Sequence, residues 1–157
     1  MSAPPRQLPP PSNPAVPPVL AAVVYLALVV ATWGFMSLAL DREVIDYADA
    51  GPLLGPTMAV SAGLVTFFAL RSRSVRVWAA ALVAASGSYL AMIAVAGIGY
   101  SVTRSDATWM LLSAAHAALS PFVAAAAGLS ALVVVAFRLA KRGSAPRDQA
   151  DGGHPTI

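Results

Sequence analysis

The chain has 157 residues, of which 58% are hydrophobic and only 11% are charged, and its formal net charge is +3. Soluble domains carry about 25% charged residues, so this composition excludes an ordinary water-soluble fold and predicts a protein whose solvent is the lipid bilayer. The absence of cysteine excludes disulfides, cysteine nucleophiles and cysteine-ligated metals.

The first segment, residues 1–18, contains eight prolines and a single charged residue, Arg6. Proline fixes φ and supplies no backbone N–H, so this composition opposes both helix and sheet. We therefore expect residues 1–18 to form a disordered proline-rich arm.

Four apolar runs follow, over residues 19–40, 52–70, 77–100 and 109–137, and none contains Asp, Glu, Lys or Arg. Each is long enough to cross a hydrocarbon core of about 30 Å as a helix. Helix is favoured because every backbone polar group in lipid must be satisfied inside its own segment. The prediction is an all-α integral membrane four-helix bundle over residues 19–140, with antiparallel up-down topology. Pro121 predicts a kink in the fourth helix.

The basic residues predict the orientation of this bundle. One side carries eight of them, whereas the other carries only Arg42 and Arg104; the eight are Arg6, Arg71, Arg73, Arg76, Arg138, Lys141, Arg142 and Arg147. Basic residues gather on the cytoplasmic side of membrane proteins, and four crossings put both termini there. We expect an inner-membrane protein with cytoplasmic termini and a disordered cytoplasmic tail over residues 141–157. Short basic clusters between apolar runs also argue against binding of nucleic acid.

Small residues repeat every three or four positions in the third and fourth runs. Such spacing places them on one helix face, and close approach of backbones at small residues drives helix association in lipid. We therefore predict a close contact between the third and fourth helices through Ala80, Ala84, Gly87, Ala91 and Ala94 on one side, and Ala117, Ala124 and Ala127 on the other.

Polar side chains inside the spans are the candidates for a functional path. His116 is the one side chain there that titrates near neutral pH, and Ser113 and Ser120 lie close to its face. Ser88 and Tyr89 form a second polar group in the third helix. Two interpretations stay open, namely a polar path with a proton relay and ordinary interhelical hydrogen bonding. We predict no metal site, because the other histidine, His154, is in the tail, and no catalytic residues or cofactor.

The segment between the first two spans is acidic, and we interpret it as a solvated external loop. The run TWGFMSLALDREVIDYADAGPLLGP, residues 32–56, resembles the corresponding region of uncharacterised small four-pass membrane proteins from high-GC actinobacteria. Its distinctive part is LALDREVID. The resemblance extends over roughly residues 20–140, and it implies topology without catalytic residues.

The functional hypothesis is a non-catalytic structural, accessory or partner-binding subunit of the membrane. Its expected partners are the lipid bilayer and another membrane protein or a second copy of the chain. The alternative is a small oligomeric channel or transporter with His116 lining a polar path. An enzyme is the hypothesis that the residues support least, because no carboxylate or metal-ligand cluster accompanies the histidine.

Overall fold

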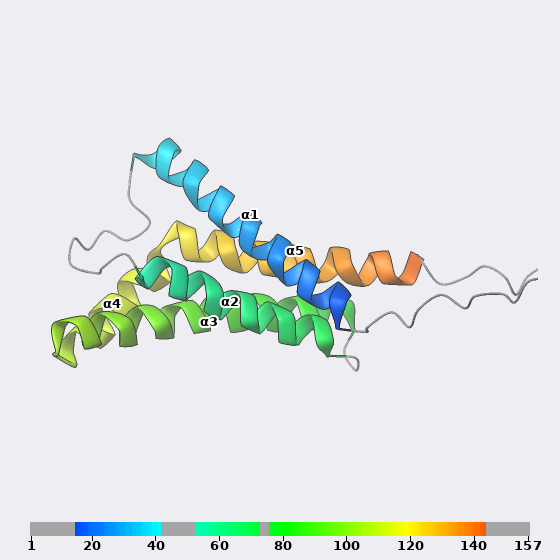
Figure 1. The fold of residues 1–157 in the computed structure, drawn as a ribbon. Helices are drawn as coiled ribbons and strands as arrows, with labels where there is room; N and C mark the ends of the chain where they lie inside the picture. The colour runs from blue at the N-terminus through cyan, green and yellow to red at the C-terminus, as the bar shows by residue number, and fades with distance from the viewer. Residues whose placement is uncertain (1–14, 42–52, 73–75, 144–157) are drawn as a thin grey trace, which may run out of the picture.

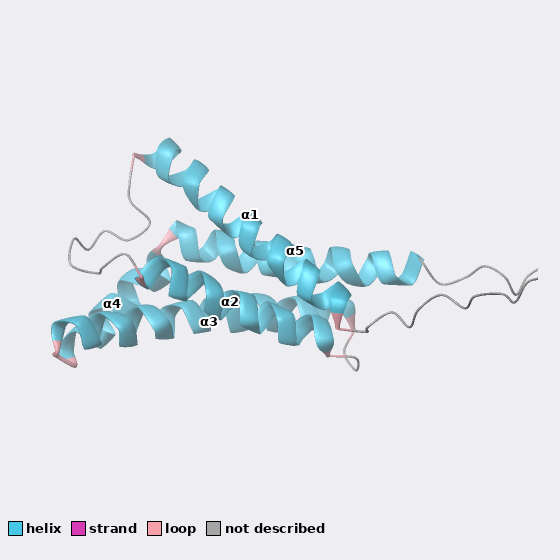
Figure 2. Cartoon of the chain, in the orientation of Figure 1, coloured by secondary structure: helices cyan, strands magenta, loops and turns pink. Residues whose placement is uncertain are grey.

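The computed structural model describes residues 15–41, 53–72 and 76–143, and throughout this part of the chain the regular structure is helical. It contains five helices, shown in Figures 1 and 2: α1 (Val16–Leu40), α2 (Leu54–Arg71), α3 (Val77–Arg104), α4 (Thr108–Leu119) and α5 (Pro121–Gly143). Four of them, all except α4, are long and apolar enough to cross a membrane. The prediction of an all-helical chain with four candidate spans is therefore confirmed. The predicted arm, acidic loop and tail fall mainly outside the described residues.

Prolines stand in the first turns of α1 and α2, where a missing backbone N–H removes no helical hydrogen bond. Pro17 and Pro18 are therefore helical, although the sequence placed them in the disordered arm. Pro56 lies in the first turn of α2. At its other end α1 stops at Leu40, and Asp41 follows in the left-handed conformation with a φ of 48°. A charged side chain thus marks the end of the first apolar helix.

The predicted fourth helix is two helices in the structure. Pro121 has no N–H for the carbonyl of Ala117, and this carbonyl instead accepts a hydrogen bond of 3.1 Å from the backbone N–H of Ser120. Ser120 is extended, with a ψ of 126°, so the chain breaks between α4 and α5 and does not merely bend. With 12 residues, α4 is about 18 Å long and too short to cross a membrane alone.

The helices pack around α3, which contacts α2, α4 and α5, while α1 contacts α2 and α5. In Figure 1, α1 leans away from the other helices toward its C-terminal end. Only one of its faces is buried, through Pro18, Tyr25, Val29 and Trp33. The main core joins Tyr25, Val29 and Trp33 of α1 to residues from the other four helices, such as Met58, Met92, Tyr100, Ala117 and Phe122.

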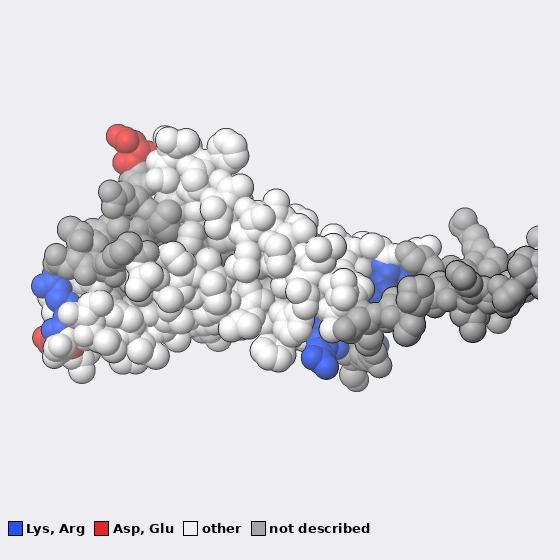
Figure 3. Space-filling view, in the orientation of Figure 1, with Lys and Arg blue, Asp and Glu red and all other residues white. Residues whose placement is uncertain are grey.

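Charges lie at the two ends of the helices (Figure 3). One end, called the basic end below, carries the described residues Arg71, Arg76, Arg138, Lys141 and Arg142. The opposite end carries Asp41, Asp106 and Arg104. Arg138 also joins two helices at the basic end, because its guanidinium donates to the backbone carbonyls of Ala69 and Ser72, at 3.1 and 2.6 Å. Ala69 lies in the last turn of α2 and Ser72 follows the helix, a place where carbonyls generally need partners from outside the helix.

Glycines mark close contacts between helices. At Gly97, an added Cβ would stand 3.0 Å from the carbonyl oxygen of Met110 and 3.3 Å from the Cβ of Ala114, so α3 and α4 touch there. At Gly87 it would meet the side chain of Val65 at 2.8 Å. Gly87 therefore packs against α2, which corrects its predicted place against the fourth span.

The other small residues of the predicted contact between the third and fourth spans differ in their exposure. Ala80, Ala84, Ala117 and Ala127 are buried, Ala91 is half-buried, and Ala94 and Ala124 are exposed. Both exposed alanines depart from the predicted contact. For Ala124 the reason is the break before Pro121, which changes the direction of the chain between Ala117 and Ala124. A single helical repeat does not continue across this break.

Candidate functional site

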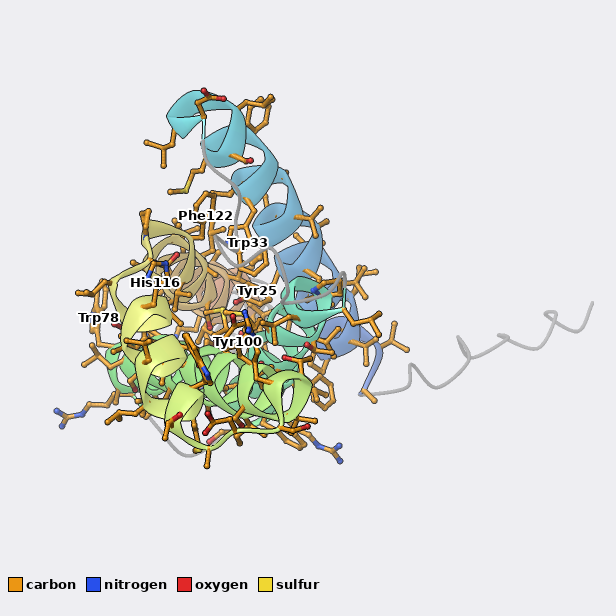
Figure 4. All side chains as sticks on the ribbon, turned by 90° about the vertical axis from the view of Figure 1, so that its left-hand side faces the viewer. Tyr25, Trp33, Trp78, Tyr100, His116 and Phe122 are labelled. Carbon is orange, nitrogen blue, oxygen red and sulfur yellow. The ribbon has the colours of Figure 1, made fainter. Side chains whose placement is uncertain are left out.

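Four hydroxyl side chains from four helices meet inside the molecule. Tyr25 comes from α1, Thr66 from α2, Ser88 from α3 and Ser130 from α5, and each has a relative exposure of 0%. We call these four residues the hydroxyl cluster. Figure 4 shows Tyr25 between α1 and the remaining helices. Apolar side chains surround the cluster, so its hydrogen bonds stand in a region of low dielectric constant, where an unpaired polar group is costly.

The hydroxyls of Thr66, Ser88 and Ser130 are hydrogen-bonded to one another. The Ser88 hydroxyl donates to Ser130 at 3.1 Å, and the oxygens of Ser130 and Thr66 are 2.8 Å apart. The Thr66 hydroxyl is also 2.8 Å from the carbonyl oxygen of Ala62 in its own helix. The three hydroxyls can all donate in one direction, because Ser88 donates to Ser130, Ser130 can donate to Thr66, and Thr66 donates to the carbonyl of Ala62.

Tyr25 attaches α1 to this group. Its hydroxyl donates to the carbonyl oxygen of Ala126 in α5 at 3.2 Å, and the Ser88 and Thr66 side chains lie near it. Two turns further along α1, the indole N–H of Trp33 donates to the carbonyl oxygen of Phe122 at 2.9 Å. The two acceptors are four residues apart and therefore lie on one face of α5. This face holds α1 at two points.

The hydroxyl cluster is closed. In the described part of the chain, every buried side-chain nitrogen or oxygen has a hydrogen-bond partner. The cluster contains no acid, base or strong nucleophile, and the described residues bring no three His, Asp or Glu side chains close enough to hold a metal ion. What the arrangement does is join four helices by directed bonds. A slip of one helix would leave hydroxyls unpaired in an apolar region.

The five candidate path residues differ in their partners and in their exposure. Ser88 belongs to the hydroxyl cluster, whereas the hydroxyl of Ser113 donates to the carbonyl of Trp109 in its own helix at 2.7 Å. The Tyr89 hydroxyl donates to the carbonyl of Ala118 at 2.6 Å, in the last turn of α4. Ser120 is the half-buried residue at the helix break, and His116 is exposed on α4 (Figure 4).

A profile of a family of unknown function, DUF6121, matches residues 14–156, nearly the whole sequence. The chain belongs to this family. No curated protein and no solved structure matches it. Membership of a family of unknown function assigns no role to any residue of this DUF6121 chain.

A second group of polar and aromatic side chains lies at the turn between α3 and α4 of the DUF6121 chain. The Arg104 guanidinium carbon lies 5.7 Å from the ring centre of Tyr100 and 5.3 Å from that of Trp109, and the two rings meet edge to face. In the turn, Asp106 accepts hydrogen bonds from the backbone N–H and the hydroxyl of Thr108, at 2.9 and 2.7 Å. These two bonds, the backbone one first, hold the pKa of the Asp106 carboxyl below its ordinary value.

Sequence reasoning missed three members of the hydroxyl cluster, namely Tyr25, Thr66 and Ser130. A signal for two of them was present, because Thr66 and Ser130 are polar residues well inside apolar runs. Their meeting was not predictable, because it depends on how four helices are rotated about their axes, and several serines and threonines in the spans satisfy their hydroxyls within their own helices.

The coupling between Thr66 and Ser130 is testable. We expect Thr66→Val and Ser130→Ala each to lower the free energy of unfolding by about 1 kcal/mol, since each leaves partners unpaired. The double variant should cost about 0.6 kcal/mol less than the sum, the usual size of an interhelical hydrogen bond in a membrane protein. Unfolding in mixed micelles with increasing dodecyl sulfate measures these values.

Ser86→Ala is the matched control for this cycle, because the Ser86 hydroxyl is exposed and bonds to the carbonyl of Leu82 in its own helix. It should change stability by a few tenths of a kcal/mol at most, in line with other exposed substitutions. Strictly additive effects of Thr66→Val and Ser130→Ala would show that the two hydroxyls do not act as a pair.

Proposed function

We propose that this chain is a multi-pass protein of the cell membrane that acts as a non-catalytic structural, accessory or partner-binding subunit. In this proposal α1, α2, α3 and α5 are the crossings of an antiparallel up-down bundle. The short α4 returns from the end of α3 toward the start of α5. Both termini lie in the cytoplasm.

The distribution of charge supports the orientation. Among the described residues, the basic end carries five arginines and lysines and the opposite end carries one, Arg104, together with Asp41 and Asp106. Cytoplasmic segments of membrane proteins are enriched in arginine and lysine. The N-terminus of α1 and the C-terminus of α5 both lie toward the basic end in Figure 1.

The closed hydroxyl cluster is the observation that carries the non-catalytic role. A solute path needs polar groups that face a cavity and exchange partners as the solute moves. Here Tyr25, Thr66, Ser88 and Ser130 have no exposed area, and their hydrogen bonds go to one another and to helix carbonyls. Polar side chains used in this way specify which helices pack together, and they support a scaffold that presents its outer surface to partners.

Reporter fusions test the orientation. Alkaline phosphatase, which is active only outside the cytoplasm, should be inactive when fused after Gly143 and active when fused after Asp106 in the α3–α4 turn. A fluorescent protein that matures in the cytoplasm should give the reverse pattern. Phosphatase activity after Gly143 would overturn the proposed topology.

The alternative function, a small oligomeric channel or transporter, now depends on more than one copy of the chain. His116 is exposed on α4, so it would line a path only between subunits. Reconstituted protein separates the two proposals. A proton or solute flux that His116→Ala abolishes, with unfolding unchanged, would favour the channel and overturn the accessory role.

A further inference from the structure

A groove runs along the outer surface between α3 and α5. It has a volume of about 520 Å³, and apolar side chains alone line it: Trp78, Ala81, Leu82 and Ala85 from α3, and Gly128, Ala131, Leu132 and Val135 from α5. Its floor is hollow because small residues occupy it. An added Cβ at Gly128 would meet no atom within 4 Å, which shows independently that this position is open.

The groove begins at the basic end and runs inward. Trp78 is the second residue of α3, has an exposed fraction of 74%, and lies at the rim of the molecule in Figure 4. From Trp78 to Ala85 the helix rises about 10 Å. If the helices cross a membrane as proposed, the groove lies within the leaflet nearest the basic end, and Trp78 is at the interface, where tryptophan is enriched.

One cationic side chain lies beyond the basic end of the groove, on the α5 face that lines it. On α5, the face that carries Gly128 and Val135 continues to Arg142, seven residues beyond Val135 and therefore two turns further on the same face. Arg142 is exposed. Within the described ranges, the basic end holds no Asp or Glu, so the potential there is positive.

We infer that this groove binds one acyl chain of an anionic phospholipid, with the headgroup phosphate against Arg142. An anionic phospholipid joins a long apolar chain to a phosphate, and this combination matches an apolar groove that ends at a cation. A partner helix would match the apolar part alone. The inference rests on the proposed membrane placement and adds a ligand class to it.

Quenching of Trp78 by brominated lipids tests the inference in the full-length protein. Brominated phosphatidylglycerol is titrated into phosphatidylcholine vesicles that contain the protein, and brominated phosphatidylcholine is titrated into matching vesicles at the same content of phosphatidylglycerol. The contribution of Trp78 is the difference between the wild type and Trp78→Phe. We expect half-maximal quenching at a several-fold lower mole fraction of the anionic lipid.

Two pairs of variants locate the site. Arg142→Gln should weaken the preference for phosphatidylglycerol about fivefold, the contribution of one basic residue near an anionic lipid surface. Lys141→Gln removes the same charge from a different face of α5 and should change the preference much less. Gly128→Leu should fill the groove and abolish the preference. Gly34→Leu, at an exposed α1 position where an added Cβ also meets nothing within 4 Å, should leave it unchanged.

Three results would overturn the inference. Equal quenching of Trp78 by both lipids would show ordinary contact with the bilayer and no selective site. Equal losses in Arg142→Gln and Lys141→Gln would show a general surface potential. Protection of Trp78 from both lipids would show that a second copy covers the groove. Failure of the protein to enter vesicles at all is a different outcome, which would contradict the proposed membrane function itself.

Discussion

Tyr25→Ala is expected to lower the free energy of unfolding by about 3–5 kcal/mol, the range for removal of a buried aromatic side chain. The Tyr25 ring has no exposed area, and α1 buries only three other residues, Pro18, Val29 and Trp33. The variant therefore leaves a cavity and also removes the hydrogen bond to the carbonyl of Ala126. We expect α1 to separate from α5 before the other helices unfold.

Two controls divide this effect into its parts. Tyr25→Phe keeps the ring and loses only the hydroxyl, so it should cost about 1 kcal/mol. Leu28→Ala shortens a side chain on the exposed face of the same helix and should cost less than either. Unfolding in dodecyl sulfate mixed micelles, followed by circular dichroism, gives all three values. Equal costs for Tyr25→Ala and Tyr25→Phe would show that packing of the ring does not hold α1.

Gly97→Leu should produce the second large effect, a loss of about 1–3 kcal/mol with displacement of α4 from α3. Even a Cβ at Gly97 would approach the carbonyl oxygen of Met110 to 3.0 Å, and this neighbour is backbone that a rotamer change does not move. Leucine adds three more carbons in the same place. Because Trp109 lies in the first turn of α4, beside Tyr100, its fluorescence should report the displacement.

Gly128→Leu is the matched control for Gly97→Leu. It makes the same substitution in a helix interior, at a position where a Cβ meets no atom within 4 Å, so it should cost little. Gly87→Leu should fall between the two, since the clash there is with the side chain of Val65, which can change its rotamer. Equal stability of the Gly97→Leu and Gly128→Leu proteins would show that α3 and α4 do not touch closely at Gly97.

Much of the fold was predictable because long apolar runs leave a chain few choices. Runs of about 20 apolar residues without charges must satisfy their own backbone, and helices are the way to do so. The predicted and observed bounds of the third helix begin at the same residue, Val77. The fourth run was the exception. Pro121 was expected to bend a helix, but Ser120 leaves the helical conformation altogether and two helices result.

The candidate site was less predictable. Ser88 was identified as polar inside a span, yet its partners Thr66 and Ser130 come from helices 22 and 42 residues away in the sequence. His116 was the main candidate for a polar path because its side chain titrates near neutral pH, but the structure places it on the exposed side of α4. Chemical type is visible in a sequence, whereas the direction in which a side chain points depends on the rotation of its helix.

Hydropathy, proline placement and charge in the amino-acid sequence were sufficient to predict that the chain is helical, where its first three helices lie and the asymmetry of charge between their ends. These features follow from local rules, since each segment meets the demands of lipid within itself. Only the tertiary structure decided that α1 is held by Tyr25 and Trp33, that Gly97 is where α3 meets α4, and that the hydroxyls of Thr66, Ser88 and Ser130 bond to one another. Apolar faces contact lipid and protein equally well, so close packing and directed hydrogen bonds select the arrangement, and both depend on segments far apart in the chain.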